Sequence, residues 1–415
     1  MIRKEVGELA LGMYISRLDR PWLESPFLFQ GFLLERQEDL DTIREICRFV
    51  DVDPELSRID VQGPVSHKPS PAQPKEAAQP TSRLKDTRLN PQRIIATLEQ
   101  QRENRIRTHD YLKQLFTDIR MGHSVDSEEA KEFVGTLVDA ITDYPDVVVW
   151  LTQMKNRDEY TSLHCLNVCV LTLAFCHHLG YGDEDLKAIG MGALLHDIGK
   201  AEIPEAVLNK PDRLTPEEWK IMRQHPEIGY RMMRGSGQIP DVALAIIRGH
   251  HRRVNGAGYP EAFPQDELSR PVLAAAIADV YDAMTSDRPY HRGLAADQVL
   301  RTMQRHGKDT FGQDLMDEFI RCVGIFPVGS VVELVNGSIA LVISAGRSAR
   351  LLPQVLLLRD TKGHKLEKRK LMDLALAATR QPESGWQIRR VVEPARHQIT
   401  QRELMLTNDS SVASS

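Results

Sequence analysis

An apolar stretch that ends in charged side chains is the feature that most constrains this fold. Residues 188–195 read AIGMGALL, a helical run, and His196, Asp197 and Lys200 follow directly after it. An imidazole, a carboxylate and an amine are costly to bury unless a partner offsets their lost hydration. A metal ion is such a partner, because carboxylates and imidazoles both bind metals. The stretch therefore predicts a buried helix whose end is a candidate metal site.

Histidines gather in the same part of the chain. Nine of the fourteen lie between residues 164 and 306, where an even distribution would put about five. His177 and His178 precede a glycine at an expected helix end, where the helix dipole favours cations, so they are interpreted as structural. The candidate metal ligands all stand in apolar helical sequence: His164, His196, Asp197, His225, His250, His251 and Asp279.

The size of this set points to more than one ion. A mononuclear zinc centre normally takes three or four protein ligands, fewer than the sequence offers. Two ions about 3.5–4 Å apart that share a bridging carboxylate are a common arrangement in enzymes that hydrolyse phosphoesters. The ligand set therefore predicts a binuclear centre and a phosphoester substrate.

Together these motifs resemble the HD-GYP domain, a subclass of the HD metal-dependent phosphohydrolases, over residues 140–326. The matching segments are YTSLH with His164, HDIGK with His196, HPEIG with His225, HHRRVNGAGYP at 250–260, and ADVYDAMTSDRPY with Asp279. They follow the order and spacing of the family. The resemblance implies an enzyme that hydrolyses cyclic di-GMP, the bacterial second messenger of biofilm and motility signalling, to pGpG, GMP or both, by a hydroxide bridging two metals.

The resemblance also implies a role for each motif residue. His164, His196, Asp197 and Asp279 hold one metal, and Asp197 bridges to a second metal held by His225, His250 and His251. Two divalent ions are the expected cofactors, Fe by the resemblance and Mn as the alternative. Lys200 is expected to act with Asp197 in catalysis, by stabilising the phosphorane or protonating the leaving 3′ oxygen. The expected substrate contacts are Arg288 to phosphate and the loop residues Gly256, Gly258, Tyr259 and Pro260, with Tyr259 available to stack on guanine.

The chain departs from the family pattern at a few positions. Arg252 and Asn255 stand where Glu and Asp are usual, and His291 replaces a basic residue common three positions past Arg288. None of these changes removes a metal ligand, so they bear on substrate affinity or loop geometry. Tyr160 stands where some relatives carry a glutamate for a third metal. Two ions, and not three, are therefore expected.

The segments ahead of this region differ in composition. Residues 1–60 alternate short apolar runs with Pro, Gly and acids, which predicts a small α+β domain with a helix near residues 38–50. This part looks like the uncharacterised small domain often found ahead of HD-GYP domains. Residues 61–93 are rich in Pro, Ala, Ser and Lys and predict a flexible linker. Residues 94–139 predict a helical connector.

The segments after it are again distinct. Residues 327–390 predict a small β-rich segment, with two strands joined by an Asn-Gly turn and a further strand at QVLLLRD. Residues 391–415 are polar and predict a disordered tail. The expected fold class is mainly α: an HD-superfamily helical bundle, preceded by a small α+β domain and followed by a short strand-rich segment.

Composition excludes several classes of protein. The net charge of -5 provides no basic surface for a nucleic-acid polymer. No apolar run approaches the ~18–20 residues needed to cross a membrane, and the N-terminus is too broken by charge for a secretory signal. Five sparse cysteines do not suggest a disulfide framework, and Cys165, Cys169 and Cys176 are interpreted as small buried hydrophobes. A cytoplasmic location is expected.

Two other interpretations stay open. One is an HD phosphohydrolase that acts on a different cyclic dinucleotide. The other is a catalytically weak receptor that binds cyclic di-GMP or partner proteins, although the complete ligand set and Lys200 argue against it. Besides cyclic di-GMP, the candidate partners are diguanylate cyclases with GGDEF domains and a second copy of this chain.

Overall fold

The structure is a computed structural model of the 415-residue chain. It describes all residues except 1, 21–24, 26, 28–30, 55, 60, 62–90, 122–126, 144, 146–148, 150–151, 153–159, 236–238, 287–292, 345–350, 401–402, 404–411 and 414–415. The chain divides into two compact units, residues 1–88 and 89–415. Most of the expected linker, 61–93, lies outside the described residues.

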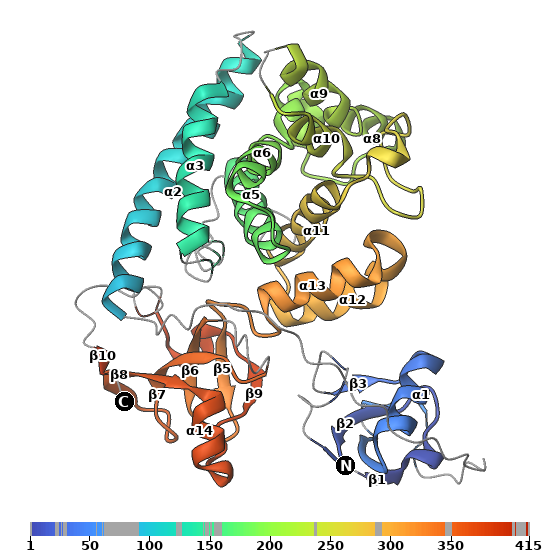
Figure 1. Cartoon of the computed structure of the whole chain (residues 1–415), viewed down its shortest axis with the longest axis vertical. Helices are drawn as coiled ribbons and strands as arrows, with labels where there is room; N and C mark the ends of the chain where they lie inside the picture. The colour runs from blue at the N-terminus through green and yellow to red at the C-terminus, as the bar shows by residue number, and fades with distance from the viewer. Residues whose placement is uncertain are drawn as a thin grey trace. The chain divides into compact units, whose positions relative to one another are not determined.

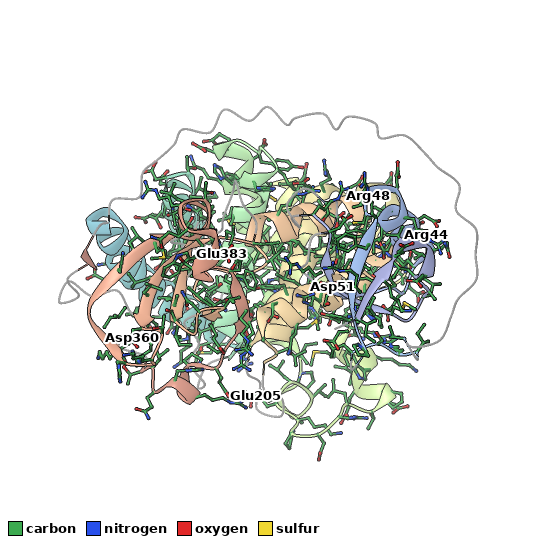
Figure 2. The ribbon with its side chains drawn as sticks, turned by 90° about the horizontal axis from the view of Figure 1, so that it is seen from below. Arg44, Arg48, Asp51, Glu205, Asp360 and Glu383 are labelled. Atoms are coloured by element: carbon green, nitrogen blue, oxygen red, sulfur yellow. The ribbon has the colours of Figure 1, made fainter. Side chains whose placement is uncertain are left out.

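The first unit is a small α+β domain, as predicted. Its elements are β1 (Ile2–Glu5), a 3-10 turn (Val6–Glu8), β2 (Tyr14–Leu18), β3 (Phe32–Leu33), α1 (Gln37–Ile46) and β4 (Phe49–Asp53), and its antiparallel sheet has the order β1-β4-β2-β3 (Figure 1). Leu40 and Ile43 of α1 and Val50 and Val52 of β4 are buried. Alternation along β4 sends Asp51 to the polar face, where it accepts a hydrogen bond from Arg3 (Figure 2).

Helices make up the first part of the second unit, as predicted. They are α2 (Pro91–Arg120), α3 (Ser127–Asp143), α5 (Tyr160–His178), α6 (Asp183–Leu194), the 3-10 turn η3 (Ile198–Glu202), α7 (Glu205–Leu208), α8 (Pro216–Met222), α9 (His225–Gly235), α10 (Asp241–Gly249), α11 (Arg270–Thr285), α12 (Ala296–Phe311) and α13 (Gln313–Val323). α5 packs against both α6 and α11 (Figure 1). Nearly all of its described side chains are buried, which fits a helix that is apolar on every side.

Local signals set some of these boundaries. α8 begins with a capping box, in which Thr215 accepts from the backbone N–H of Glu218 and the Glu218 carboxylate accepts from that of Thr215. The order Thr-Pro-Glu-Glu at 215–218 is the sequence signature of such a cap.

A six-stranded sheet completes the second unit. Its strands are β5 (Val331–Leu334), β6 (Ile339–Ser344), β7 (Gln354–Arg359), β8 (Lys365–Asp373), β9 (Ile388–Val391) and β10 (Val412–Ala413), in the order β10-β8-β7-β6-β5-β9, with α14 (Leu374–Arg380) between β8 and β9. The predicted Asn-Gly turn joins β5 to β6, and Gly337 has the positive φ of 88° that such a turn requires.

The expected disordered tail, 391–415, contains ordered structure. Val391 ends β9, residues 394–397 form a 3-10 turn, and β10 pairs in parallel with β8. Glu403 pairs with the buried Arg359 of β7, with an Nη1 to Oε1 distance of 3.0 Å. This pairing could not be predicted from local sequence, because the partner lies 44 residues away.

Close approach of η3 and α9 requires a glycine at position 199. A Cβ atom there would lie 2.0 Å from the carbonyl oxygen of His225. We expect Gly199→Ala to push α9 away and to lower the free energy of unfolding by about 1–3 kcal/mol or more, the usual cost of overpacking. Urea denaturation measures the loss. Gly235→Ala at the far end of α9, where a Cβ meets no atom within 4 Å, is the control and should be neutral or stabilising. Equal stability of the two variants would contradict the argument.

Candidate metal centre

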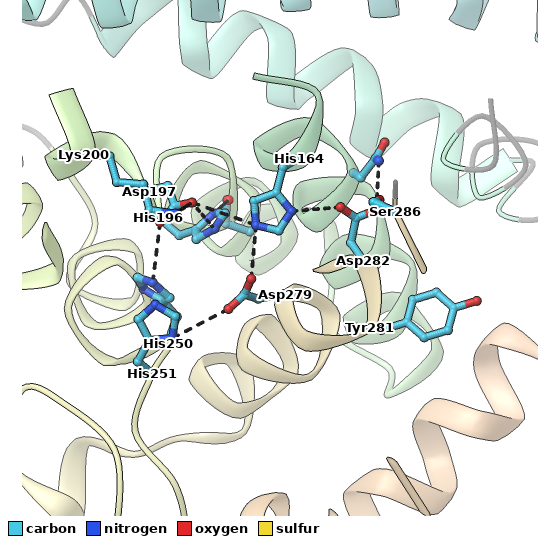
Figure 3. Close-up of polar contacts among 12 residues, drawn as sticks. His164, His196, Asp197, Lys200, His250, His251, Asp279, Tyr281, Asp282 and Ser286 are labelled. Carbon is cyan, nitrogen blue, oxygen red and sulfur yellow. Dashed lines mark hydrogen bonds and ion pairs between the residues drawn. The ribbon is translucent and has the colours of Figure 1, made fainter. Parts of the chain in front are cut away.

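The seven predicted ligands come together in the helical part of the second unit. Figure 3 shows His164 projecting from α5, His196 and Asp197 from the end of α6, and Asp279 from α11. His225 is the first residue of α9, and His250 and His251 follow directly after α10. Six of the seven are buried, and His251 is partly buried. Five segments that are far apart in the sequence therefore supply one polar cluster inside an apolar bundle.

The cluster contains two groups of potential ligand atoms that have no residue in common. Within each group, one nitrogen or oxygen atom per residue lies within 4.8 Å of the others. We call these the His225 triad (His225, His250 and His251) and the His164 triad (His164, His196 and Asp279). They coincide with the two ligand sets that the sequence resemblance implied, apart from the shared Asp197.

Asp197 lies between the two triads and turns one oxygen to each. Its Oδ1 is 3.2 Å from Nε2 of His225 and 4.0 Å from Nε2 of His250. Its Oδ2 is 3.4 Å from Nε2 of His196 and 3.9 Å from Nε2 of His164. This is the arrangement that a carboxylate shared by two cations requires.

Asp279 also reaches both sides of the cluster. Its Oδ1 is 3.1 Å from Nε2 of His164, and its Oδ2 is 3.7 Å from Nδ1 of His251. Two carboxylates therefore face five imidazoles, of which Figure 3 labels all but His225.

Hydrogen bonds fix which nitrogen of each imidazole faces the centre. Nδ1 of His196 lies 2.8 Å from the carbonyl oxygen of Ala193, and Nδ1 of His225 lies 2.8 Å from that of Met222. Nδ1 of His250 is 3.0 Å from the carbonyl of Ile247. A carbonyl oxygen can only accept, so each Nδ1 carries the proton and each neutral ring presents an Nε2 lone pair.

Those lone pairs lack a donor within the described structure. Nε2 of His225 and Nε2 of His250 face each other at 3.3 Å, although neither carries a proton in this tautomer. Nε2 of His196 is buried and makes no hydrogen bond to a described residue. Buried acceptors without donors are costly, and a cation placed among them would satisfy them all. The donor set thus fits bound metal ions.

Burial and neighbouring charges set the protonation states of the cluster. Burial lowers the pKa of His225, moves that of His250 well below 6.5, and lowers that of His251 to about 3. Burial opposes the charge of His164 as well, but hydrogen bonds to Asp279 and Asp282 outweigh it and raise the pKa to about 9. The His225 triad is therefore neutral and ready to donate lone pairs.

Asp197 is ionised because the Lys200 ammonium lies beside it. Burial acts to raise its pKa, but the charges and hydrogen bonds around the carboxylate, that of the Lys200 ammonium first, outweigh burial and hold the pKa well below 3.8. Lys200 donates to Oδ2 of Asp197 at 2.6 Å, and this contact keeps its own pKa raised despite burial. Lys200 thus stays protonated. It lies on the 3-10 turn η3 and contacts the cluster through Asp197.

The 250–260 loop is shaped by its glycines and by the two residues that depart from the family pattern. Gly256 and Gly258 have positive φ angles of 79° and 88°, and a Cβ on Gly258 would lie 1.9 Å from the carbonyl of His251. Arg252 is buried and donates to the carbonyl of Gly258 at 3.3 Å. Asn255 accepts from the N–H of Ala257 at 3.1 Å, an Asx turn. Both departures therefore support the loop's own fold.

The loop brings Tyr259 against the His225 triad. Its ring lies 4.5 Å from that of His251 and 6.1 Å from that of His225, centroid to centroid, and a cis peptide bond joins it to Pro260. The predicted substrate residue Arg288, His291 and the side chain of Tyr160 lie outside the described residues. The expectations for phosphate binding and for a missing third metal therefore stay predictions.

Sequence reasoning missed residues that act behind the ligands. Asp282 accepts from Nδ1 of His164 at 2.8 Å and from Asn167 at 2.9 Å, so it orients a ligand as carboxylates commonly do in metal sites. Its position three residues after Asp279, on the same helix face, was the available signal. Cys165 lies close to His196 and Asp197. Burial first, and then Asp197, raise the pKa of this thiol well above 9, so it is a poor metal ligand.

Comparison with known proteins agrees with this geometry. The family model described as HD domain matches residues 138–315, and the model described as domain of unknown function DUF3391 matches residues 2–130. The cyclic di-GMP phosphodiesterase PA4108 of Pseudomonas aeruginosa is 31% identical over 405 residues, which cover 94% of each chain. The chain belongs to the HD-GYP family. It is a phosphohydrolase whose HD domain follows a DUF3391 domain, which confirms the predicted class of enzyme and fold.

Other HD-GYP relatives align with less than half of the chain. A cyclic di-GMP phosphodiesterase of Thermotoga maritima is 32% identical over 192 residues, 45% of this chain and 52% of that protein. The 3′3′-cGAMP-specific phosphodiesterase 2 of Vibrio cholerae is 29% identical over 201 residues, 46% of this chain and 36% of that protein. The shared activity among these relatives is hydrolysis of a cyclic dinucleotide.

No helix in the described part of the chain is long and apolar enough to cross a membrane.

Neutral buried histidines predict acid sensitivity of the metal-free protein. His225, His250 and His251 have lowered pKa values when folded and ordinary values near 6.5 when unfolded. The unfolded chain therefore binds more protons as the pH falls through 6.5, and stability falls with it. His164 has a raised pKa, so its contribution to stability grows as the pH falls, but it is one group and the three lowered histidines outweigh it. After chelation, we expect the free energy of unfolding in urea to fall by roughly 2–5 kcal/mol between pH 7 and pH 5.

A histidine outside the cluster is the control for this titration. His306 is exposed, so His306→Gln should leave the pH dependence unchanged. His250→Gln should flatten it. Equal stability of the chelated protein at the two pH values would show that the three imidazoles are not held neutral.

Proposed function

We propose that this HD-GYP chain hydrolyses cyclic di-GMP with two divalent metal ions held by the described cluster. The observation that carries the proposal is the division of the ligand atoms into two triads with one Asp197 oxygen toward each. A single zinc site would use fewer ligands and would not need a shared carboxylate. The 31% identity to a named cyclic di-GMP phosphodiesterase over nearly the whole chain supports this substrate.

The ligand roles in this proposal follow the geometry. His164, His196 and Asp279 would hold one ion, His225, His250 and His251 the other, and Asp197 both. When bound, such ions lower the pKa of water, which supplies a nucleophile near neutral pH, and neutralise charge on the phosphate. Mixed imidazole and carboxylate ligands suit Fe and Mn, and we propose Fe, with Mn as the alternative.

The chain's own groups complete the chemistry. Lys200 is held protonated by Asp197 at 2.6 Å, so it has a proton to donate to the leaving 3′ oxygen and a charge to place beside the phosphate. Tyr259 sits on the outer side of His251 and offers a ring face to a guanine base. Gly258 has no side chain, so the loop backbone comes close to the carbonyl of His251. The Tyr259 ring, on the next residue, therefore lies beside the ring of His251. Arg288, outside the described residues, is proposed to bind a phosphate.

Product analysis tests the reaction itself. We expect protein loaded with Fe or Mn to convert cyclic di-GMP to pGpG, with or without further cleavage to GMP, as chromatography of the products would show. His196→Ala removes an inward Nε2 and should lower kcat/KM by roughly 100-fold or more together with the metal content. His306→Ala, an exposed histidine on α12, is the matched control and should be unaffected.

Three outcomes would contradict this function. A protein that binds cyclic di-GMP with full metal content and leaves it intact is a receptor. One that cleaves 3′3′-cyclic GMP-AMP and spares cyclic di-GMP is a phosphodiesterase of other specificity. One metal ion per chain in elemental analysis would contradict the binuclear centre.

Removal of the Lys200 ammonium separates catalysis from metal binding. We expect Lys200→Met to lower kcat by roughly 10²–10³-fold, the usual effect of losing one group that stabilises transition-state charge. KM and metal content should change little, because neither triad contains Lys200. Lys187→Met on α6, which removes an exposed lysine paired with Glu184, is the control and should keep full kcat. A proportional loss of metal and activity in Lys200→Met would show that this lysine only supports Asp197.

A further inference from the structure

An exposed tryptophan stands near the centre and has no role in the chemistry above. Trp219, on α8, is 45% exposed and is the only aromatic among the large hydrophobic side chains found exposed in the described part of the chain. Exposure of a single apolar side chain is common and carries no argument by itself. Its neighbours give it significance.

A cation links Trp219 to the metal cluster. The guanidinium carbon of Arg223 lies 5.7 Å from the ring centroid of Trp219 and 5.6 Å from that of Tyr259. The Tyr259 ring in turn lies 4.5 Å from that of His251. Tyr259, Arg223 and Trp219 therefore follow one another outward from His251, a member of the His225 triad. They come from two separate segments, the 250–260 loop and α8 with the residue after it.

Arg223 is exposed and holds no carboxylate within the described residues, whereas Lys210 nearby in sequence is bound to Glu218 at 2.6 Å. The guanidinium charge is therefore available to a ligand. Its backbone is anchored on both sides, because the capping box at Thr215 starts α8 and His225 begins α9 two residues after Arg223. Movement of this pair would move a residue of the cluster.

We propose that Trp219 and Arg223 form a subsite for one guanine of the cyclic dinucleotide, outward of Tyr259. The Trp219 indole stacks on the base, a contact that every base allows. The Arg223 guanidinium donates to O6 and N7 of guanine, the edge that an arginine fork fits in a bidentate way. Adenine carries an amino donor in place of O6, so the same fork disfavours it. This inference rests on the proposed function, since it assigns a specificity to that site.

Kinetics with two substrates test the stacking contact. We expect Trp219→Ala to raise KM for cyclic di-GMP by roughly 5- to 100-fold, the range for loss of one base stack, with kcat reduced far less. Bis(p-nitrophenyl) phosphate has no purine, so its kcat/KM should fall much less than that for cyclic di-GMP. Trp219→Phe keeps a ring and should recover most of the lost affinity. Lys220→Ala, the exposed neighbour of Trp219, is the control for both substrates.

Base selectivity tests Arg223. We expect Arg223→Ala to weaken binding of cyclic di-GMP to the chelated protein by roughly 5- to 100-fold and to leave binding of cyclic di-AMP nearly unchanged. Quenching of tryptophan fluorescence reports this binding, and the quenching should be lost in Trp219→Phe. An equal loss for both dinucleotides would overturn guanine recognition by Arg223.

These measurements separate the two proposals. If the wild-type protein cleaves cyclic di-GMP and Trp219→Ala has an unchanged KM, the subsite is wrong and the proposed function stands. If the wild-type protein binds cyclic di-GMP without cleaving it, the proposed function fails, and the fluorescence titration of the variants still decides the subsite. If loss of activity in Trp219→Ala is equal for both substrates, Trp219 supports the fold of α8 and does not contact a base.

Discussion

Neutralisation of one buried carboxylate organises the second unit. Asp197 stands at the end of an apolar helix and stays ionised because Lys200 and imidazoles surround it. Its two oxygens face opposite sets of candidate ligands, so α5, α6, α9, α10 and α11 all have to bring a polar side chain to the same point. The absence of a side chain at Gly199 serves that need, because it lets η3 and α9 approach closely enough for His225 to reach Asp197.

Much of this could be predicted from sequence, where a local pattern decides the structure. The capping box at Thr215 and the Asn-Gly turn at Gly337 depend on residues within a few positions of each other, and both are present. The seven ligand candidates were found because each is a polar residue in apolar helical sequence, and the structure gathers all seven. Their proposed roles as ligands rest on the family pattern and on the inward direction of Nε2 in His196, His225 and His250.

Contacts between distant segments could not be predicted. Asp282 contacts His164 across 118 positions. Its place three residues after Asp279 indicates that the two share a helix face, but it does not indicate which ligand Asp282 orients. The contacts of Arg223 with Trp219 and Tyr259 could not be predicted either, because Tyr259 lies in a distant segment. Arg252 and Asn255 were expected to bear on substrate affinity or on loop geometry. Their contacts support loop geometry, because Arg252 donates to the carbonyl of Gly258 and to the side chain of Gln265, and Asn255 accepts from the N–H of Ala257. The polar composition of residues 391–415 predicted a disordered tail, but Glu403 in that segment pairs with Arg359 of β7.

The anchoring of the imidazoles has a consequence for how the centre exchanges its ions. Each Nδ1 of His196, His225 and His250 is tied to a backbone carbonyl of its own helix or of the turn before it. The rings are thus aimed before any ion arrives, and little chain ordering has to accompany loading. Under the proposed function, such a centre fills and empties without refolding, so the fraction of working enzyme follows the free concentration of the metal in its surroundings.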